Sequence, residues 1–406
     1  MEFIISDRMS KMKGSAIREI FKVAGDPSYI SLAGGNPAPE LFPNKELAEI
    51  ASELLNENPV LSLQYGVTEG YAPLKEKIKE MLAEKENISF EGNDIMITSG
   101  GQQGIELITK ALVNEGDTVI VEEPSFIGAT NAFRSYNAKL VGVPVEKDGI
   151  SPEKLEKVIA ENKNIKILYV IPTFQNPSGE TMSLEKRKAV LEIARKNNIL
   201  VIEDNPYGEL TFDGNKIPTI KSMDEGLNVA YSGSFSKVIA PGLRVGYIVA
   251  PTELIAKIAV GKQISDVHTS ILPQLLVYEF LKRYNLDDYI KENRKLYAHR
   301  CSVMINAMKE YFPEQVTYTE PKGGLFIWCD MHGEYDTKEV AKECMKEKVV
   351  FVPGSTFMVD MEAKCSAFRL NFSTMTDERI VEGIKILGNA LKKIMGGNNN
   401  GYYQNR

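Results

Sequence analysis

Residues 94–124 read DIMITSGGQQGIELITKALVNEGDTVIVEEP and contain a short apolar run, a longer segment and a second apolar run. The two runs, at 94–98 and 118–122, are rich in isoleucine or valine and have the length of strands. The segment between them repeats its apolar residues with the period of a helix. A strand, a helix and a second strand in this order form the unit from which parallel sheets are built.

The same alternation continues to residue 250. Further apolar runs occur in KILYVIPTF (166–174), ILVIEDNPY (199–207), NVAYSGSFSK (228–237) and VGYIVA (245–250), and a helical period occurs in SLEKRKAVLEIARKNN (183–198). The sequence therefore predicts an α/β fold whose large domain is built on a mainly parallel sheet.

The C-terminal third of the chain has a different pattern. Long charged helical segments reach from 278 to 312 and are followed by GGLFIWCDM (323–331), VVFVPGSTF (349–357) and FRLNFS (368–373). This pattern predicts a smaller α+β domain with a short, partly antiparallel sheet. We expect an N-terminal arm and part of the small domain at 1–45, the large domain at 46–277, the small domain at 278–395, and a disordered low-complexity tail at 396–406.

The bulk composition excludes several classes of function. The chain has 406 residues and a formal net charge of −7, so it lacks the basic balance of a nucleic-acid scaffold. Its four cysteines form no CxxC pair, which predicts neither a zinc site nor a disulfide framework. Because the chain shows no signal peptide and no run of about 18 apolar residues, we expect a cytoplasmic protein that binds no nucleic acid, no membrane and no metal.

Polar residues close the apolar runs. They are Ser99, Glu122, Thr173, Asp204 and Ser234. In open α/β sheets a ligand binds in the crevice at the carboxyl ends of the strands. These residues are therefore expected to face one common site.

Four features near these strand ends could bind a ligand or take part in a reaction. Each of them also has a purely structural explanation. SGGQQG (99–104) opens a helix with small residues, which suits a phosphate but also a plain turn. Asn176 could face a ligand or form a turn before proline, and Asp204 could meet a cation or cap a helix. Lys237 is a surface charge or, if burial and Arg244 lower its pKa, a Schiff-base lysine. Several separate strand ends would place these groups in one crevice. Chance is therefore a poor explanation for their presence together.

Taken in order, the motifs resemble those of fold-type I pyridoxal-phosphate (PLP) enzymes, specifically the class I and II aminotransferases. Within them the chain is most similar to the branch that contains kynurenine/2-aminoadipate and aromatic aminotransferases. The matching motifs, spread over residues 10–395, are SAIREIF, LAGGNPAPELFP, LQYGVTEGYAPLKEKI, ITSGGQQGIEL, EEPSF, PTFQNPSGETMS, IEDNPYGEL, SGSFSKVIAPGLRVGY and FRLNFS. The resemblance implies a seven-stranded, mainly parallel sheet. The interval from Lys237 to Arg244 is one residue shorter than in aspartate-type aminotransferases, which makes that group the poorer template.

The resemblance implies a role for each cofactor-binding residue. Lys237 would bind PLP as a Schiff base and carry the proton that leaves the substrate Cα. Asp204 would keep the pyridine nitrogen protonated, Asn176 and Tyr207 would hydrogen-bond the phenolic oxygen, and Phe126 would stack on the ring. The phosphate would be bound by Gly101, Gln102, Ser234, Ser236 and Arg244.

The resemblance also implies how the substrate is bound. Arg369 would bind the α-carboxylate together with Asn176, although an edge-strand arginine that faces water is the ordinary reading. Gly35 would lie close to the substrate, and Tyr65 would reach the phosphate of a neighbouring subunit, so a homodimer with shared active sites is expected. Arg18 matches an arginine that meets the substrate in some relatives, but a helix-surface arginine is an equal alternative.

The activity implied is transfer of an amino group between an amino acid and a 2-oxo acid, with 2-oxoglutarate as the expected partner. The amino acid would be aromatic, 2-aminoadipate-like or broadly aliphatic. A PLP-dependent β-lyase or decarboxylase stays open because one fold serves many reactions. A MocR-like sensor is disfavoured, since those regulators carry a basic DNA-binding domain and this chain begins almost directly with SAIRE.

Overall fold

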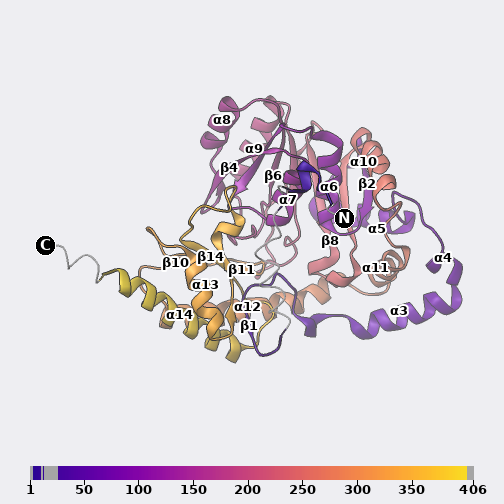
Figure 1. Ribbon diagram of the computed structural model, residues 1–406. Coiled ribbons are helices and arrows are strands. Elements are labelled where there is room, and N and C mark those ends of the chain that lie inside the picture. The colour runs from indigo at the N-terminus through magenta and orange to yellow at the C-terminus, as the bar shows by residue number, and fades with distance from the viewer. Residues whose placement is uncertain (1–2, 11, 13–25, 400–406) are drawn as a thin grey trace.

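The computed structural model describes residues 3–10, 12 and 26–399. It contains two α/β units that lie side by side, the larger in the upper part of Figure 1 and the smaller at its lower left. The site described below lies between them.

An eight-stranded sheet forms the centre of the larger unit. In spatial order its strands are β2 (Asn93–Thr98), β9 (Gly246–Pro251), β8 (Val229–Ser234), β7 (Leu200–Asp204), β6 (Ile165–Val170), β3 (Thr118–Glu123), β4 (Lys139–Glu146) and β5 (Gly149–Ile150). The five strands from β8 to β4 are parallel to their neighbours, whereas β9 and β5 run antiparallel to theirs. The expected mainly parallel sheet is confirmed, and the two-residue β5 is an addition to the seven strands expected.

Helices cover both faces of this sheet. They are α5 (Ala72–Glu86), α6 (Gly101–Leu112), α7 (Ile127–Ser135), α8 (Pro152–Glu161), α9 (Leu184–Lys196), α10 (Thr252–Ser265) and α11 (Ile271–Arg283). Successive residues of a strand point to opposite faces, and β3 shows this directly. Ile120 belongs to the core beneath α8 and α9, while Val119 and Val121 belong to the core shared with α6 and α7. Both faces of the central strands are therefore buried, as their nearly continuous apolar runs predict.

The smaller unit contains a four-stranded antiparallel sheet. Its order is β10 (Thr317–Tyr318), β11 (Phe326–Asp330), β14 (Ala367–Asn371) and β13 (Val352–Pro353). A separate parallel pair joins β1 (Ile30–Ser31) to β12 (Val349–Val350), so residues near the N-terminus pack beside the C-terminal sheet. The domain boundary expected at 277/278 stays a prediction, and residue 278 lies within α11.

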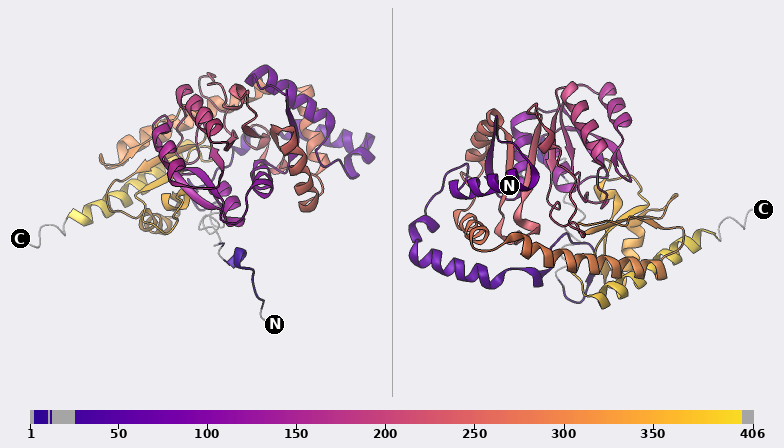
Figure 2. Two further views of the ribbon diagram at one scale, coloured as in Figure 1. Left: turned by 90° about the horizontal axis from the view of Figure 1, so that it is seen from above. Right: turned by 180° about the vertical axis from the view of Figure 1, so that it is seen from behind.

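Helices α12 (Leu286–Tyr311), α13 (Thr337–Lys346) and α14 (Asp377–Asn399) accompany the smaller sheet. The long helical segment expected from 278 onward is divided between α11 and α12, because Asn285 caps α12 by accepting the backbone N–H of Asp287 at 3.0 Å. Helix α14, which packs beside α12 (Figure 2), is described as far as residue 399, and the tail expected from 396 stays a prediction. Residues 400–406 lie outside the described residues.

The remaining segments are three helices and five 3₁₀ turns of the described residues. They are helices α1 (Asp7–Ser10), α3 (Asn44–Glu57) and α4 (Pro59–Leu63), and 3₁₀ turns η1 (Pro39–Leu41), η2 (Lys221–Met223), η3 (Phe235–Lys237), η4 (Pro241–Leu243) and η5 (Gly354–Phe357). Turns η3 and η4 follow β8 directly and place Lys237 and Arg244 at the carboxyl end of the sheet.

Candidate active site

A cavity of about 550 Å³ lies at the carboxyl ends of the central strands and reaches the smaller sheet. It brings together side chains or backbone from twelve positions selected on sequence: Gly35, Gly101, Gln102, Phe126, Asn176, Asp204, Tyr207, Ser234, Ser236, Lys237, Arg244 and Arg369. Segments more than 300 residues apart in the chain therefore form one site.

Lys237 is a buried amine without an acidic partner among the described residues. Its Nζ donates to the carbonyl of Gly35 at 2.5 Å. Burial, and then the nearby positive charges of Arg369 and Arg244, lower the pKa of this amine to about 8. About a tenth of Lys237 is therefore neutral and nucleophilic at pH 7, and its place in the cavity excludes the surface-charge reading.

Asp204 ends β7 at the floor of the cavity. It is only 6% exposed, and its Oδ2 accepts the hydroxyl of Tyr169 at 2.8 Å. Burial raises the pKa of the carboxyl to about 6, while the Tyr169 hydrogen bond opposes that rise. Asp204 therefore meets a hydroxyl donor inside the sheet rather than capping a helix, and it remains an anion at neutral pH that can hold a cationic group in the cavity.

Backbone and hydroxyl donors gather at the start of α6. The first N–H groups of this helix have no intrahelical acceptor, so they favour an anion. Gly100 has φ +79°, and a Cβ there would lie 2.2 Å from a guanidinium nitrogen of Arg244. Arg244 Nη2 donates to Ser99 O at 3.2 Å, and Ser234 donates to Ser236 through their hydroxyls at 2.9 Å. This cradle suits a phosphate.

Arg369 lies in β14, between β11 and β13, and is 4% exposed. It donates from Nη1 to Asn176 Oδ1 at 2.8 Å and from Nη2 to Ala33 O at 2.6 Å, while its buried Nε has no hydrogen-bond partner. The rings of Phe326 and Phe357 lie 4.1 and 4.9 Å from its guanidinium carbon. Burial lowers its pKa to about 10, and in the part of the chain that the structure describes no carboxylate forms an ion pair with it. The water-facing reading is wrong, and the site is suited to bind a carboxylate.

Comparisons with known proteins agree with this geometry. A family model described as aminotransferase class I and II matches residues 28–387. The chain belongs to the class I and II aminotransferases.

Individual aminotransferases are similar over nearly the whole chain. Aromatic-amino-acid aminotransferase 1 of Thermococcus litoralis is 38% identical over 97% of this chain and 95% of its own length. The 2-aminoadipate transaminase of Thermus thermophilus is 37% identical over 95% of this chain and 96% of its own. The crystal structure of Pyrococcus horikoshii kynurenine aminotransferase, in complex with PMP, KYN as substrate and KYA as product, is 37% identical with a TM-score of 0.92 and covers 96% of this chain and 97% of that chain.

One described residue among those selected on sequence, Tyr65, does not line the cavity. Tyr65 is 82% exposed, and its ring lies 5.8 Å from that of His268. Its predicted contact with a neighbouring subunit stays a prediction. Arg18 lies outside the described residues.

Sequence reasoning missed two residues at the site. Tyr169 is the hydroxyl donor to Asp204, and Phe326 packs against both Arg369 and, at 5.7 Å between ring centroids, Tyr207. A tyrosine within the otherwise apolar run KILYVI was the available signal for the first. Phe326 stands in an ordinary apolar strand and gave no signal.

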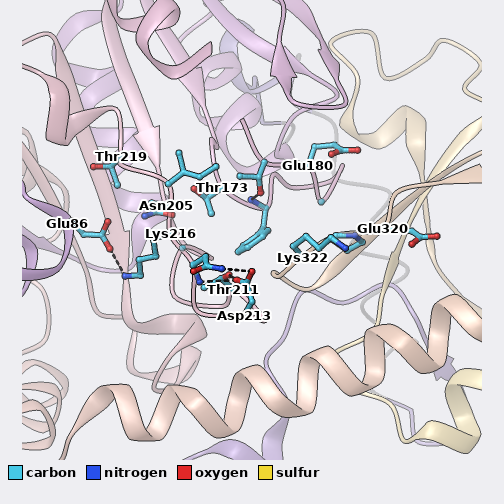
Figure 3. Close-up of a pocket in the computed structure, with 17 residues that line it drawn as sticks. Glu86, Thr173, Glu180, Asn205, Thr211, Asp213, Lys216, Thr219, Glu320 and Lys322 are labelled. Carbon is cyan, nitrogen blue, oxygen red and sulfur yellow. Dashed lines mark hydrogen bonds and ion pairs between the residues drawn. The ribbon is translucent and has the colours of Figure 1, made fainter. Parts of the chain in front are cut away.

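Figure 3 shows a second cavity of about 300 Å³. It shares no lining residue with the site described above. Its lysine Lys216 is ion-paired with Glu86 and Glu209, each at 2.6 Å, and these carboxylates raise the pKa of the amine against the effect of burial. Lys216 therefore stays charged and cannot serve as a nucleophile. Lys237, which has no such carboxylate partner among the described residues, has a lowered pKa instead.

The described ranges contain no group of three or more histidine, cysteine, aspartate or glutamate side chains placed to hold a metal ion. Within the same ranges, no helix combines the length and apolarity needed to span a bilayer.

Proposed function

We propose that this aminotransferase uses PLP to move an amino group between an aromatic, 2-aminoadipate-like or aliphatic amino acid and a 2-oxo acid, with 2-oxoglutarate as the common acceptor. The observation that carries the proposal is Lys237, a buried amine with a lowered pKa, placed between a phosphate cradle and Arg369.

The residues present fit the cofactor. The cradle at the start of α6, with Ser234, Ser236 and Arg244, would hold the phosphate. Asp204, the anionic group on the cavity floor, would face the ring nitrogen, and Phe126 would pack against the ring. When bound, PLP supplies a conjugated ring that accepts the electron pair released as the substrate Cα loses its proton.

The residues of the chain would perform the remaining steps. Arg369 would bind the α-carboxylate through its planar fork and fix Cα near Lys237. Neutral Lys237 Nζ would then accept the Cα proton, a role that its pKa of about 8 supports. Asn176 and Tyr207 would complete the site, since Asn176 contacts Arg369 directly and Tyr207 is 4% exposed beside Phe326.

A homodimer is also proposed. Large apolar side chains are exposed on two neighbouring segments, at 60–67 and 260–267, including Val60 at 75%, Tyr65 at 82% and Ile264 at 74%. The contact between Tyr65 and His268 joins the two segments. Exposed apolar surface of this kind supports a subunit interface, from which Tyr65 would reach the neighbouring phosphate cradle.

The cytoplasm is the proposed location. All four cysteines, Cys301, Cys329, Cys344 and Cys365, are free thiols. Absence of disulfides supports a reducing compartment.

A half-reaction screen tests the function. The PLP form is mixed with 2-aminoadipate, kynurenine, phenylalanine, tyrosine, leucine, methionine, glutamate, alanine or aspartate, and conversion to the pyridoxamine form is followed by absorbance. Conversion with recovery of the matching 2-oxo acid supports transamination. Release of ammonia and pyruvate from a suitable substrate would instead identify a β-lyase, and release of carbon dioxide a decarboxylase.

A further inference from the structure

Glu122 is a buried carboxyl group that the proposed reaction does not use. It is the residue before the last of β3, is 1% exposed, and accepts through Oε2 from the backbone N–H of Ile171 at 3.0 Å and from Gln175 Nε2 at 3.2 Å. It makes no ion pair within the described ranges. Burial, with a smaller contribution from the neighbouring carboxylate of Asp204, raises its pKa to about 8, although its two hydrogen bonds oppose the rise. A buried carboxyl group is costly unless it is hydrogen-bonded, so its contacts need an explanation.

Gln175 is the partner that links Glu122 to the site. It is 2% exposed, and its amide group is fully used: Nε2 also donates to Pro124 O at 2.8 Å, and Oε1 accepts the N–H of Ser178 at 2.8 Å. Its backbone N–H donates to Glu180 O at 2.8 Å. Gln175 therefore fastens the loop 175–180 to the end of β3.

Asn176 is the next residue of that loop. It is 4% exposed, and its Oδ1 accepts from Arg369 Nη1 at 2.8 Å. The position of this oxygen therefore helps to fix the guanidinium. A displacement of the loop would misalign the group that binds the substrate carboxylate.

We propose that Glu122 is a positioning residue: by holding Gln175 it places Asn176 where Asn176 orients Arg369 toward the substrate carboxylate. This inference rests on the proposed function, in which Arg369 binds the α-carboxylate. Glu122 itself does not line the cavity.

Three variants separate positioning from general stabilisation. Glu122→Leu replaces the carboxyl group by an apolar group of similar size and so removes the hydrogen-bond acceptor. Glu122→Gln keeps an oxygen that can accept the N–H groups of Ile171 and Gln175. Glu203→Leu is the matched control. Glu203 is also 1% exposed, has a pKa raised by burial to about 7, and accepts two backbone N–H groups, those of Ile220 at 2.9 Å and Lys221 at 2.7 Å.

Two readouts follow carboxylate binding. The first is steady-state kinetics with the amino acid and with the 2-oxo acid, in which the change in KM is compared with the change in kcat. The second is the dissociation constant of 3-phenylpropionate, a carboxylate without an amino group, measured on the PLP form by tryptophan fluorescence. Trp328 is the single tryptophan of the chain; it is paired with Arg369 across β11 and β14, and its ring lies 5.8 Å from that of Phe357.

Glu122→Leu should raise both KM values and the dissociation constant of 3-phenylpropionate by about tenfold, the effect of losing one buried hydrogen-bond contact, with a smaller change in kcat. Glu122→Gln should have wild-type values of both KM constants and of the dissociation constant. Glu203→Leu should lower the free energy of unfolding without changing these three constants. A folded Glu122→Leu protein with wild-type values, or the same rise in Glu203→Leu, would overturn the inference. If Glu122→Leu does not fold, Gln175→Ala tests the same linkage and should give the same rise; wild-type values there would also overturn it.

Failure of this inference can be distinguished from failure of the proposed function. If the wild-type protein transaminates and Glu122→Leu binds substrates with wild-type affinity, only the positioning role of Glu122 is refuted. A wild-type protein that converts no amino acid removes the proposed function, and the fluorescence titration then still decides whether Glu122 controls carboxylate binding.

Discussion

Replacing Arg369 by lysine changes the proposed carboxylate site in a defined way. Lysine keeps one positive charge but has no planar fork. The guanidinium uses one nitrogen for Asn176 and another for Ala33, at 2.8 and 2.6 Å, and still has Nε without a partner. A single ammonium group cannot maintain both contacts and also bind a carboxylate through two donors.

The size of the effect follows from the bonds lost. One hydrogen bond to a charged group contributes about 1.5–3 kcal/mol, which corresponds to a rise in KM of about 10- to 150-fold for the amino acid and for the 2-oxo acid. Either Asn176 Oδ1 or Ala33 O also loses its donor, so the free energy of unfolding should fall by about 1–3 kcal/mol.

The assay is steady-state kinetics with both substrates, together with urea denaturation. Arg187→Lys is the matched control, because Arg187 is 0% exposed and donates to backbone carbonyls, including Pro172 at 2.8 Å and Met182 at 3.0 Å, without lining the active-site cavity. It should lose stability and keep its KM values. An Arg369→Lys protein with wild-type KM for both substrates would refute the assignment of the carboxylate site.

Three other changes give independent tests. Asp204→Asn should lower PLP affinity and kcat together by about 10- to 150-fold, since it removes a charge-assisted contact of about 1.5–3 kcal/mol; spectroscopic cofactor titration and kinetics check this, and unchanged values exclude the role. Lys221→Met breaks an ion pair with Asp224 whose side chains are 1% and 0% exposed, so urea denaturation should show a loss of about 3–5 kcal/mol, against about 0–1 kcal/mol for Lys77→Met in an exposed pair. The pKa of Glu203 is raised by burial from 4.5 to about 7, so its contribution to stability is complete below pH 4.5 and falls as the pH rises toward 7. Glu203→Gln should flatten that fall, and identical pH profiles for the two proteins would contradict it.

The sequence predicted the strands that carry the site but not every strand of the sheet. Strands such as β7 are nearly continuous apolar runs because both their faces are buried, and this pattern is visible in one dimension. Strand β4 (Lys139–Glu146) was not found, because it lies near the sheet edge and most of its residues are partly or fully exposed. Its mixed composition resembles that of a loop.

The site was predicted in its residue types better than in its contacts. The motifs identified Lys237, Asp204 and Arg369, since each stands in a distinctive short pattern. Their partners depend on register and long-range packing. Tyr169 reaches Asp204 only because β6 and β7 are neighbours, and Glu122 meets Gln175 across 53 positions of sequence. Spacing along the chain cannot reveal such contacts.

Lys237 is proposed as the residue that binds PLP as a Schiff base. The most direct measurement is borohydride reduction of the PLP-loaded protein, followed by peptide mass spectrometry to locate the phosphopyridoxyl group. We expect the phosphopyridoxyl group on Lys237, and we expect it to be absent in Lys237→Ala. A label on another lysine, such as the ion-paired Lys216 of the second cavity, or no label at all, would contradict it.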